Sequence, residues 1–200
     1  MVLSPGAATI GANGRITFCA IVTGAINPDV SWSASAGSIV SVGTGRGRLT
    51  APSVATLVIV TATSVEDSGK SDLATITVIT GFATVSGRVL RSSSTTGIAG
   101  IVIEFRNAAG SVVAQVTTAS CGDFGAAVPV TATRFHLQNG SVPSGFYKQY
   151  TYDTLRYTTV ETTCSAPLPA LSADTAAPLV TNITIPPTTQ PPPPPPNGCP

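Results

Sequence analysis

The sequence has 200 residues, enough for one large β domain or for two small domains that each bury a core. Only 10% of the residues are charged, whereas a globular domain usually carries about 25%. We therefore expect either that other subunits bury much of the surface or that Ser, Thr and glycans keep the protein soluble. The net charge of +1 and the scattered Lys and Arg residues give no basic footprint, so nucleic-acid binding is not expected.

The chain shows no sign of membrane insertion or of a leader. No apolar run reaches the 18 residues that suggest a membrane span. The segment Met1-Val-Leu-Ser-Pro5 lacks both the basic and the apolar region of a signal peptide. We therefore expect a mature or excised segment that is exported by a signal outside it.

Short alternating runs rich in Val, Ile and Thr recur between Gly, Ser, Asn and Pro, and no segment has a helical period. This pattern predicts an all-β protein, and the strand spacing is typical of β-sandwiches. A break near Thr80-Gly81 predicts two tandem sandwiches, residues 1–80 and 81–185, followed by an extended polyproline arm, residues 186–200. The predicted strands are Arg15–Thr23, Val30–Ala34, Ser38–Val42, Thr56–Ala62, Leu73–Ile79, Thr84–Leu90, Ile101–Arg106, Val112–Thr117, Arg134–Leu137, Phe146–Tyr152, Thr158–Thr162 and Leu179–Ile185.

The first half carries three motifs in order: Val30-Ser-Trp-Ser, Leu49-Thr-Ala-Pro52 and Val60-Thr-Ala-Thr-Ser64. Over residues 2–79 it resembles the bacterial Ig-like domains of surface and adhesin-type proteins. This resemblance implies an Ig-like sandwich that acts as a stalk or spacer without catalysis. Trp32 is the only tryptophan, and we expect it to be a core ring because strand aromatic residues are mostly buried. The alternative for Trp32 is stacking on carbohydrate.

The second half contains Val85-Ser-Gly-Arg-Val89, Gly97-Ile-Ala-Gly-Ile101 and Ser120-Cys-Gly-Asp-Phe124. Over residues 84–130 these motifs resemble the carboxypeptidase-regulatory, transthyretin-like sandwich. Together, the two resemblances imply a domain pair found in bacterial surface and stalk proteins.

The residues offer little for catalysis. The only histidine, His136, alternates with Phe135 and Leu137 and is expected to face solvent. The one adjacent pair of carboxylates, Glu66-Asp67, lies in a turn-rich segment and is also expected to be solvated. The four cysteines are too far apart for a zinc site, and no nucleotide motif is present. We therefore expect no enzymatic activity, no cofactor and no metal.

The even number of cysteines predicts two disulfides in an extracellular protein. Cys121 and Cys164 lie in the same half, so the simplest pairing joins them and leaves Cys19 and Cys199. Strand alternation directs Cys19 away from the core of the first half. A Cys19–Cys199 bond either joins two copies or closes within one chain, and we favour the bond between copies.

The arm can reach far from its own domain, because polyproline rises about 3.1 Å per residue and the fifteen residues of the arm span roughly 45 Å. A compact domain of about 90 residues is only about 30 Å across. We therefore expect the arm to dock on the first sandwich of a neighbouring copy. The residues expected to dock are Pro191, Pro192, Pro193, Pro194, Pro195 and Pro196.

Two triplets, Asn139-Gly-Ser141 and Asn182-Ile-Thr184, fit the N-glycosylation pattern and make Asn139 and Asn182 glycosylation candidates. The segment Leu179–Ile185 is expected to be either the last strand of the second sandwich or a donor strand that completes a neighbour's sheet.

These observations predict a non-catalytic, secreted structural subunit of an extracellular filament or cell-surface appendage. Its partners would be copies of itself in a head-to-tail polymer, with glycans as a further class. The alternative is a carbohydrate-binding or spacer module of a secreted hydrolase or adhesin. In that alternative, Trp32 or the group Tyr147, Tyr150, Tyr152 and Tyr157 forms the sugar-binding face.

Overall fold

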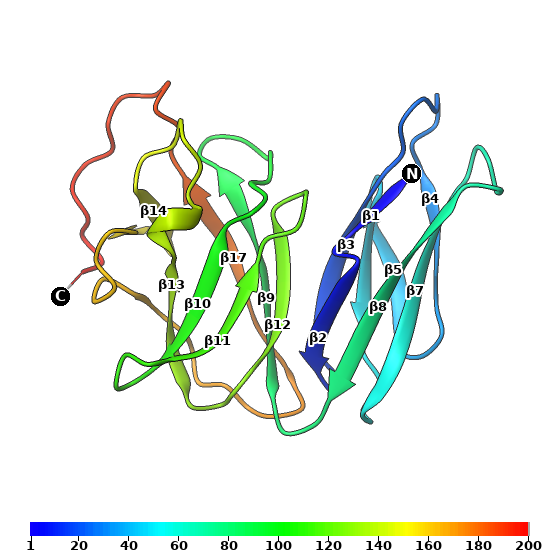
Figure 1. Cartoon of the computed structure of the whole chain (residues 1–200), viewed down its shortest axis with the longest axis horizontal. Helices are drawn as coiled ribbons and strands as arrows, with labels where there is room; N and C mark the ends of the chain where they lie inside the picture. Colours follow the sequence, from blue (N-terminus) through cyan, green and yellow to red (C-terminus); the bar gives the residue numbers. More distant parts are fainter. Residues whose placement is uncertain (200) are drawn as a thin grey trace.

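The computed structural model describes the backbone of residues 1–199 and the side chains of residues 1–175 and 183–199. Its strands form four sheets that pack in pairs as two tandem β-sandwiches (Figure 1). The predicted all-β class with two sandwiches in tandem is confirmed. In the described part of the chain the only helical element is one 3₁₀ turn, η1 (Asn139–Ser141).

The N-terminal sandwich consists of two four-stranded sheets, with strand orders β1-β3-β6-β5 and β2-β8-β7-β4. A single extended segment supplies the first strand of each sheet, because the chain crosses from one sheet to the other at Pro5. The strands are β1 (Val2–Ser4), β2 (Ala7–Gly11), β3 (Arg15–Ile21), β4 (Val30–Ala34), β5 (Ser38–Gly43), β6 (Arg46–Thr50), β7 (Thr56–Ser64) and β8 (Ser71–Ile79).

The core of this sandwich follows from strict alternation along its strands. From Val58 in β7 and from Ala74 in β8 every second residue is buried, and all of these except Ser64 are apolar. Burying a valine or isoleucine side chain contributes about 1.5–3 kcal/mol to the free energy of folding. Trp32 packs against this core with its ring 6.4 Å from that of Phe18, as the sequence predicts.

The C-terminal sandwich has a four-stranded sheet, β11-β10-β13-β16, and a five-stranded sheet, β12-β9-β17-β14-β15. The segment Leu179–Ile185 belongs to β17, which pairs in parallel with β9 of the same chain and is therefore the last strand of its own sandwich. The strands are β9 (Ala83–Arg91), β10 (Val102–Asn107), β11 (Val112–Thr117), β12 (Asp123–Val128), β13 (Ala132–Leu137), β14 (Gln149–Tyr152), β15 (Leu155–Thr158), β16 (Ala166–Pro167) and β17 (Ala176–Ile185).

The predicted strand Thr158–Thr162 is wrong, because strand β15 ends at Thr158. A two-residue turn, Asp153-Thr154, joins β14 to β15, and both residues have positive φ, 46° and 67°. Such a turn matches the twist of a hairpin and usually contains Asn-Gly or Asp-Gly. The unusual Asp-Thr pair therefore hides the hairpin in the sequence.

The tyrosines of this hairpin belong to the core. Tyr150 and Tyr157 are paired across the two strands, their rings stack 5.2 Å apart, and both are almost completely buried. Burial also raises the pKa of the Tyr150 hydroxyl. These two rings are therefore unavailable to a sugar, and the predicted carbohydrate-binding group of four tyrosines is wrong.

His136 is buried, with 1% of its surface exposed, so its predicted solvent-facing position is also wrong. Both faces of β13 are covered over Phe135–Leu137, and backbone groups of Thr159 and Cys164 and the ring of Tyr150 lie beside the imidazole. Neither ring nitrogen has a hydrogen-bond partner among the described residues. Burial is the main cause that lowers the pKa of His136 below its ordinary value of 6.5. The Arg106 cation lowers this pKa further, whereas the Glu104 carboxylate raises it.

This lowered pKa predicts a loss of stability on acidification. Below about pH 6.5 the unfolded chain binds a proton that the folded chain takes up only at lower pH, so the free energy of unfolding falls as pH falls. We expect the midpoint of thermal unfolding to drop between about pH 7.5 and pH 5.5, and to drop less in His136→Gln. Equal slopes for the two proteins would contradict this assignment.

Candidate functional site at the junction of the two sandwiches

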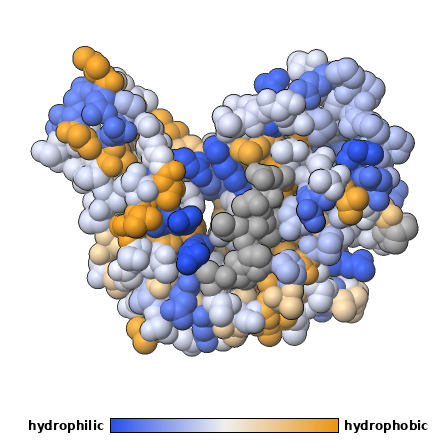
Figure 2. Space-filling view, turned by 180° about the vertical axis from the view of Figure 1, so that it is seen from behind, coloured by the Kyte–Doolittle hydropathy of each residue, from blue (hydrophilic) through white to orange (hydrophobic). Residues whose placement is uncertain are grey.

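The two sandwiches meet along one side, where β12 lies against β2 and β3. Residues 80–82 form the whole connection between β8 and β9. Seen from behind, the sandwiches are two lobes with a notch between them on the side away from this connection (Figure 2). We call the contact of β12, β9 and the connection with β2, β3 and β6 the junction.

A disulfide between Cys19 and Cys121 crosses the junction. Cys19 lies on β3 and points away from the core of its own sandwich, as strand alternation predicts. The turn before β12 covers it, and the Cα atoms of the two cysteines are 6.2 Å apart. The predicted Cys121–Cys164 pair is therefore wrong, because the turn that carries Cys121 faces the neighbouring sandwich.

An ion pair lies beside this disulfide. Arg46 on β6 donates a hydrogen bond of 2.6 Å from Nη2 to Oδ1 of Asp123. Asp123 is the first residue of β12 and is 3% exposed. Burial raises the pKa of Asp123, and the hydrogen bond from Arg46 opposes this rise. Arg88 on β9 lies 3.9 Å from the second carboxylate oxygen and donates to the carbonyl of Cys121. The pair thus fixes the orientation of the cross-linked turn.

Thr84 forms a second polar contact across the junction, a pair of buried hydrogen bonds with Gly11. Its hydroxyl accepts a 2.8 Å hydrogen bond from the Gly11 amide and donates one of 3.2 Å to the Gly11 carbonyl. Gly14 lies so close to this hydroxyl that a Cβ atom there would overlap it. Glycine is therefore required for the β2–β3 turn to approach β9 this closely.

The connection between the sandwiches is tethered as well. The carboxylate of Asp174 accepts a hydrogen bond of 2.9 Å from the Gly81 amide, and its backbone carbonyl accepts one of 3.0 Å from the Asn13 side chain. The Asp174 amide in turn donates to the carbonyl of Phe82. Residues from both sandwiches thus hold the connection in place.

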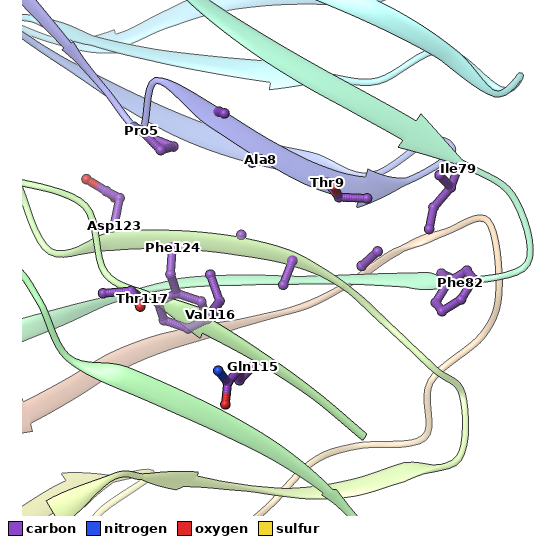
Figure 3. A pocket seen from close by; sticks show the side chains of 14 residues that line it. Pro5, Ala8, Thr9, Ile79, Phe82, Gln115, Val116, Thr117, Asp123 and Phe124 are labelled. Carbon is purple, nitrogen blue, oxygen red and sulfur yellow. The ribbon is translucent and has the colours of Figure 1, made fainter. Parts of the chain in front are cut away.

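A groove of about 350 Å³ runs along the junction between β2 on one side and β11 and β12 on the other (Figure 3). Its walls are mostly small or apolar, and include Ala8, Val116 and Phe124. The titratable side chain in its lining, Asp123, is held by Arg46. The groove therefore offers packing surface rather than a set of groups for proton transfer.

The second disulfide joins Cys164 to Cys199 and closes the arm on its own chain. Along the way the Tyr147 hydroxyl donates to the carbonyl of Gln190 at 3.0 Å. The amides of Asn197 and Gly198 both donate to the carbonyl of Arg156, and Gly198 lies against the Tyr157 ring with no room for a Cβ atom.

The arm therefore docks on the C-terminal sandwich of its own chain. Both the predicted docking on a neighbour's first sandwich and the predicted Cys19–Cys199 bond are wrong. The sequence argument failed because it assumed that a stiff arm leaves its domain. Pro187 instead pairs with Phe146, and the chain then turns at Thr188-Thr189, where the Gln190 amide donates a hydrogen bond of 3.0 Å to the Pro187 carbonyl.

The other predicted residues lie outside the junction. Asn139 is exposed in η1 and accepts a hydrogen bond from the Thr159 hydroxyl, so its glycosylation stays a prediction. The side chain of Asn182 lies outside the described residues. Glu66 and Asp67 are exposed in a turn, as predicted.

Within the described residues, no cluster of His, Cys, Asp and Glu could hold a metal ion, and no helix is long and apolar enough to cross a membrane.

The residues that form the junction were mostly missed from the sequence. Arg46 and Thr84 lie in strands outside the quoted motifs, Asp123 lies in a motif that indicated only the fold, and Asp174 lies far along the chain from the groups it contacts. The one available signal was the turn Gly11-Ala-Asn-Gly14, where two glycines indicate close backbone approach. Together, the fold and the junction define a tandem β-sandwich protein whose sandwiches are covalently cross-linked.

No family model matches the chain, and no curated protein matches its sequence. Among solved structures, it is similar to the Bacillus anthracis TIE protein, with 9% identity and a TM-score of 0.39, over 90% of this chain and 33% of that one. It is also similar to GBS52, the minor pilin of Streptococcus agalactiae, with 13% identity and a TM-score of 0.33, over 76% of this chain and 68% of that one. A third is BcpA, the major pilin subunit of Bacillus cereus, with 10% identity and a TM-score of 0.35, over 94% of this chain and 69% of that one.

The chain thus spans a third of the TIE protein and about two thirds of each of the two pilins. All three TM-scores are below 0.5, so these similarities say nothing about what the chain does.

The position of the two disulfides predicts how each contributes to the free energy of unfolding and to the coupling of the two sandwiches. Loop closure over 102 residues makes the Cys19–Cys121 bond worth about 4–5 kcal/mol, and closure over 35 residues makes the Cys164–Cys199 bond worth about 4 kcal/mol. We expect Cys19→Ser with Cys121→Ser to split calorimetric unfolding into two transitions. Cys164→Ser with Cys199→Ser, the matched control, should keep one transition at a lower temperature. A single transition in both double variants would contradict the coupling.

Proposed function

We propose that the chain is a non-catalytic, load-bearing structural subunit of an extracellular or cell-surface appendage, whose partners are further copies of itself. The observation that carries this proposal is the order of the two disulfides along the chain. They join Cys19 to Cys121 and Cys164 to Cys199, so the two loops they close follow one another without overlap.

This order shortens the covalent path between the two ends. A pull on the ends passes from Cys19 to Cys121 and from Cys164 to Cys199, and residues 20–120 and 165–198 carry no tension while both bonds are intact. Strands β4 to β11 lie within the first of these shielded segments. About a third of the chain remains in the loaded path. A subunit of this kind limits its own extension under force.

The junction adds rigidity to this covalent path. The Arg46–Asp123 pair, the double hydrogen bond between Thr84 and Gly11, and the contacts of Asp174 hold the sandwiches at a fixed angle. Flexible tandem domains usually have long, polar linkers with few contacts across them, whereas here three residues connect the two sandwiches. A fixed angle suits a rod or stalk.

Composition and cysteine chemistry support the location. Disulfides persist in oxidising environments such as the cell exterior, and the structure records no free cysteine. A surface with few charges suits a protein that is covered by neighbouring subunits. The resemblances to Ig-like and transthyretin-like domains of surface proteins support the same assignment, and a glycan on Asn139 would add solubility.

Force spectroscopy on a single chain held by its two ends tests the load-bearing role. An extended chain spans about 3.4 Å per residue, so we expect the oxidised protein to reach an end-to-end length of at most about 220 Å and the reduced protein one of about 680 Å. The difference arises because reduction releases both shielded segments. An oxidised chain that extends to the full length would contradict the proposal.

Assembly is tested separately, because a rigid spacer within a longer secreted protein is the rival function. We expect the oxidised chain to form larger species with rising concentration in sedimentation experiments, and linear polymers in electron micrographs. A chain that stays monomeric at all concentrations, but shows the limited extension, would favour the spacer over the subunit.

A further inference from the structure

The proline run of the arm has a defined conformation. Each residue from Gln190 to Pro195 precedes a proline, which excludes the α-helical region for its backbone. Every peptide bond in the described part of the arm is trans. Consecutive trans prolines form a left-handed polyproline II helix with three residues per turn. Every third side chain therefore lies on the same edge of this helix.

Burial along the run follows this period of three. Pro193 and Pro196 are partly buried, whereas Pro191, Pro192, Pro194 and Pro195 are exposed. One edge of the helix therefore faces the C-terminal sandwich and the other two edges face solvent. We call the four exposed prolines the proline ridge. Figure 1 shows the arm, in red, on the outer side of this sandwich.

Both ends of the ridge are held. Before it, the Gln190 carbonyl accepts a hydrogen bond from Tyr147. After it, Nε of Arg156 donates to the Pro195 carbonyl at 3.3 Å, the Asn197 side chain accepts from the Arg156 amide at 2.7 Å, and Cys199 is bonded to Cys164. The ridge is thus fixed in orientation as well as in conformation.

We propose that the proline ridge is a binding surface for a separate protein that presents a groove lined by aromatic rings. Aromatic grooves bind polyproline II helices by packing rings against the proline edges, and a preformed helix loses little entropy on binding. Fixing it at both ends lowers this cost further. The ridge has no charged residue within it, so apolar contact and bonds to its carbonyls would carry recognition.

A second copy of this chain does not fit as the partner. The large hydrophobic side chains that are exposed in the described residues are all Val, Ile or Leu, and the aromatic rings are buried or half-buried. The chain therefore presents no exposed aromatic groove of its own within this part. The inference goes beyond the structural role proposed above and does not depend on it.

The test compares two pairs of substitutions that each remove two prolines spaced three residues apart. Pro192→Ala with Pro195→Ala alters one outward edge, and Pro193→Ala with Pro196→Ala alters the inward edge. The probe is a WW domain, a polyproline-binding module, chosen because it binds a synthetic peptide of residues 186–198. Its affinity for the oxidised full chain is measured by calorimetric titration.

We expect the outward pair to weaken binding by at least about tenfold and the inward pair by less than about threefold. In the synthetic peptide of residues 186–198, which has no sandwich to rest on, both pairs should weaken binding equally because a free helix has no privileged edge. Failure of the oxidised chain to bind the probe would overturn the proposal. Equal losses from the two pairs in the oxidised chain would also overturn it.

Discussion

The disulfide between Cys19 and Cys121 is the constraint on which the arrangement of the two sandwiches depends. A partly buried ion pair such as Arg46–Asp123 contributes little net stability by itself, because removing charges from water costs about as much as their attraction returns. The same holds for a threonine hydroxyl that must find partners in a buried contact. The cross-link brings the two sandwiches together and holds these groups at contact distance. The polar contacts therefore only have to fix the angle between the sandwiches.

The second disulfide extends the same logic to the arm. A proline-rich segment usually behaves as a stiff linker that leaves its domain. Here Cys199 returns it to Cys164, and Arg156 and Tyr157 supply the surface on which its end rests. The result is one unit in which both the second sandwich and the arm are fastened to what precedes them. In this unit the proline ridge is exposed to solvent and is not used to join subunits.

The sequence was sufficient for the fold class and for strands with clear alternation, such as β7 and β8. It failed where tertiary contacts overrode local pattern. The hairpin at Asp153-Thr154 lacks the usual turn residues, β2 is short and ends in glycine, and the glycine and two arginines of β6 mask its period. His136 alternates as a surface residue would, yet packing from distant segments buries it. The disulfide pairing was out of reach because it depends on how the sandwiches meet, which no local pattern encodes.

Peptide mapping of the native, unreduced protein by mass spectrometry tests the central claim most directly. The account predicts one cross-linked peptide pair containing Cys19 and Cys121 and another containing Cys164 and Cys199, both recovered from the monomeric species. Cross-linked peptides that join Cys121 to Cys164, or Cys19 to Cys199, would contradict it. Either would mean that the bond between Cys19 and Cys121 does not cross the junction.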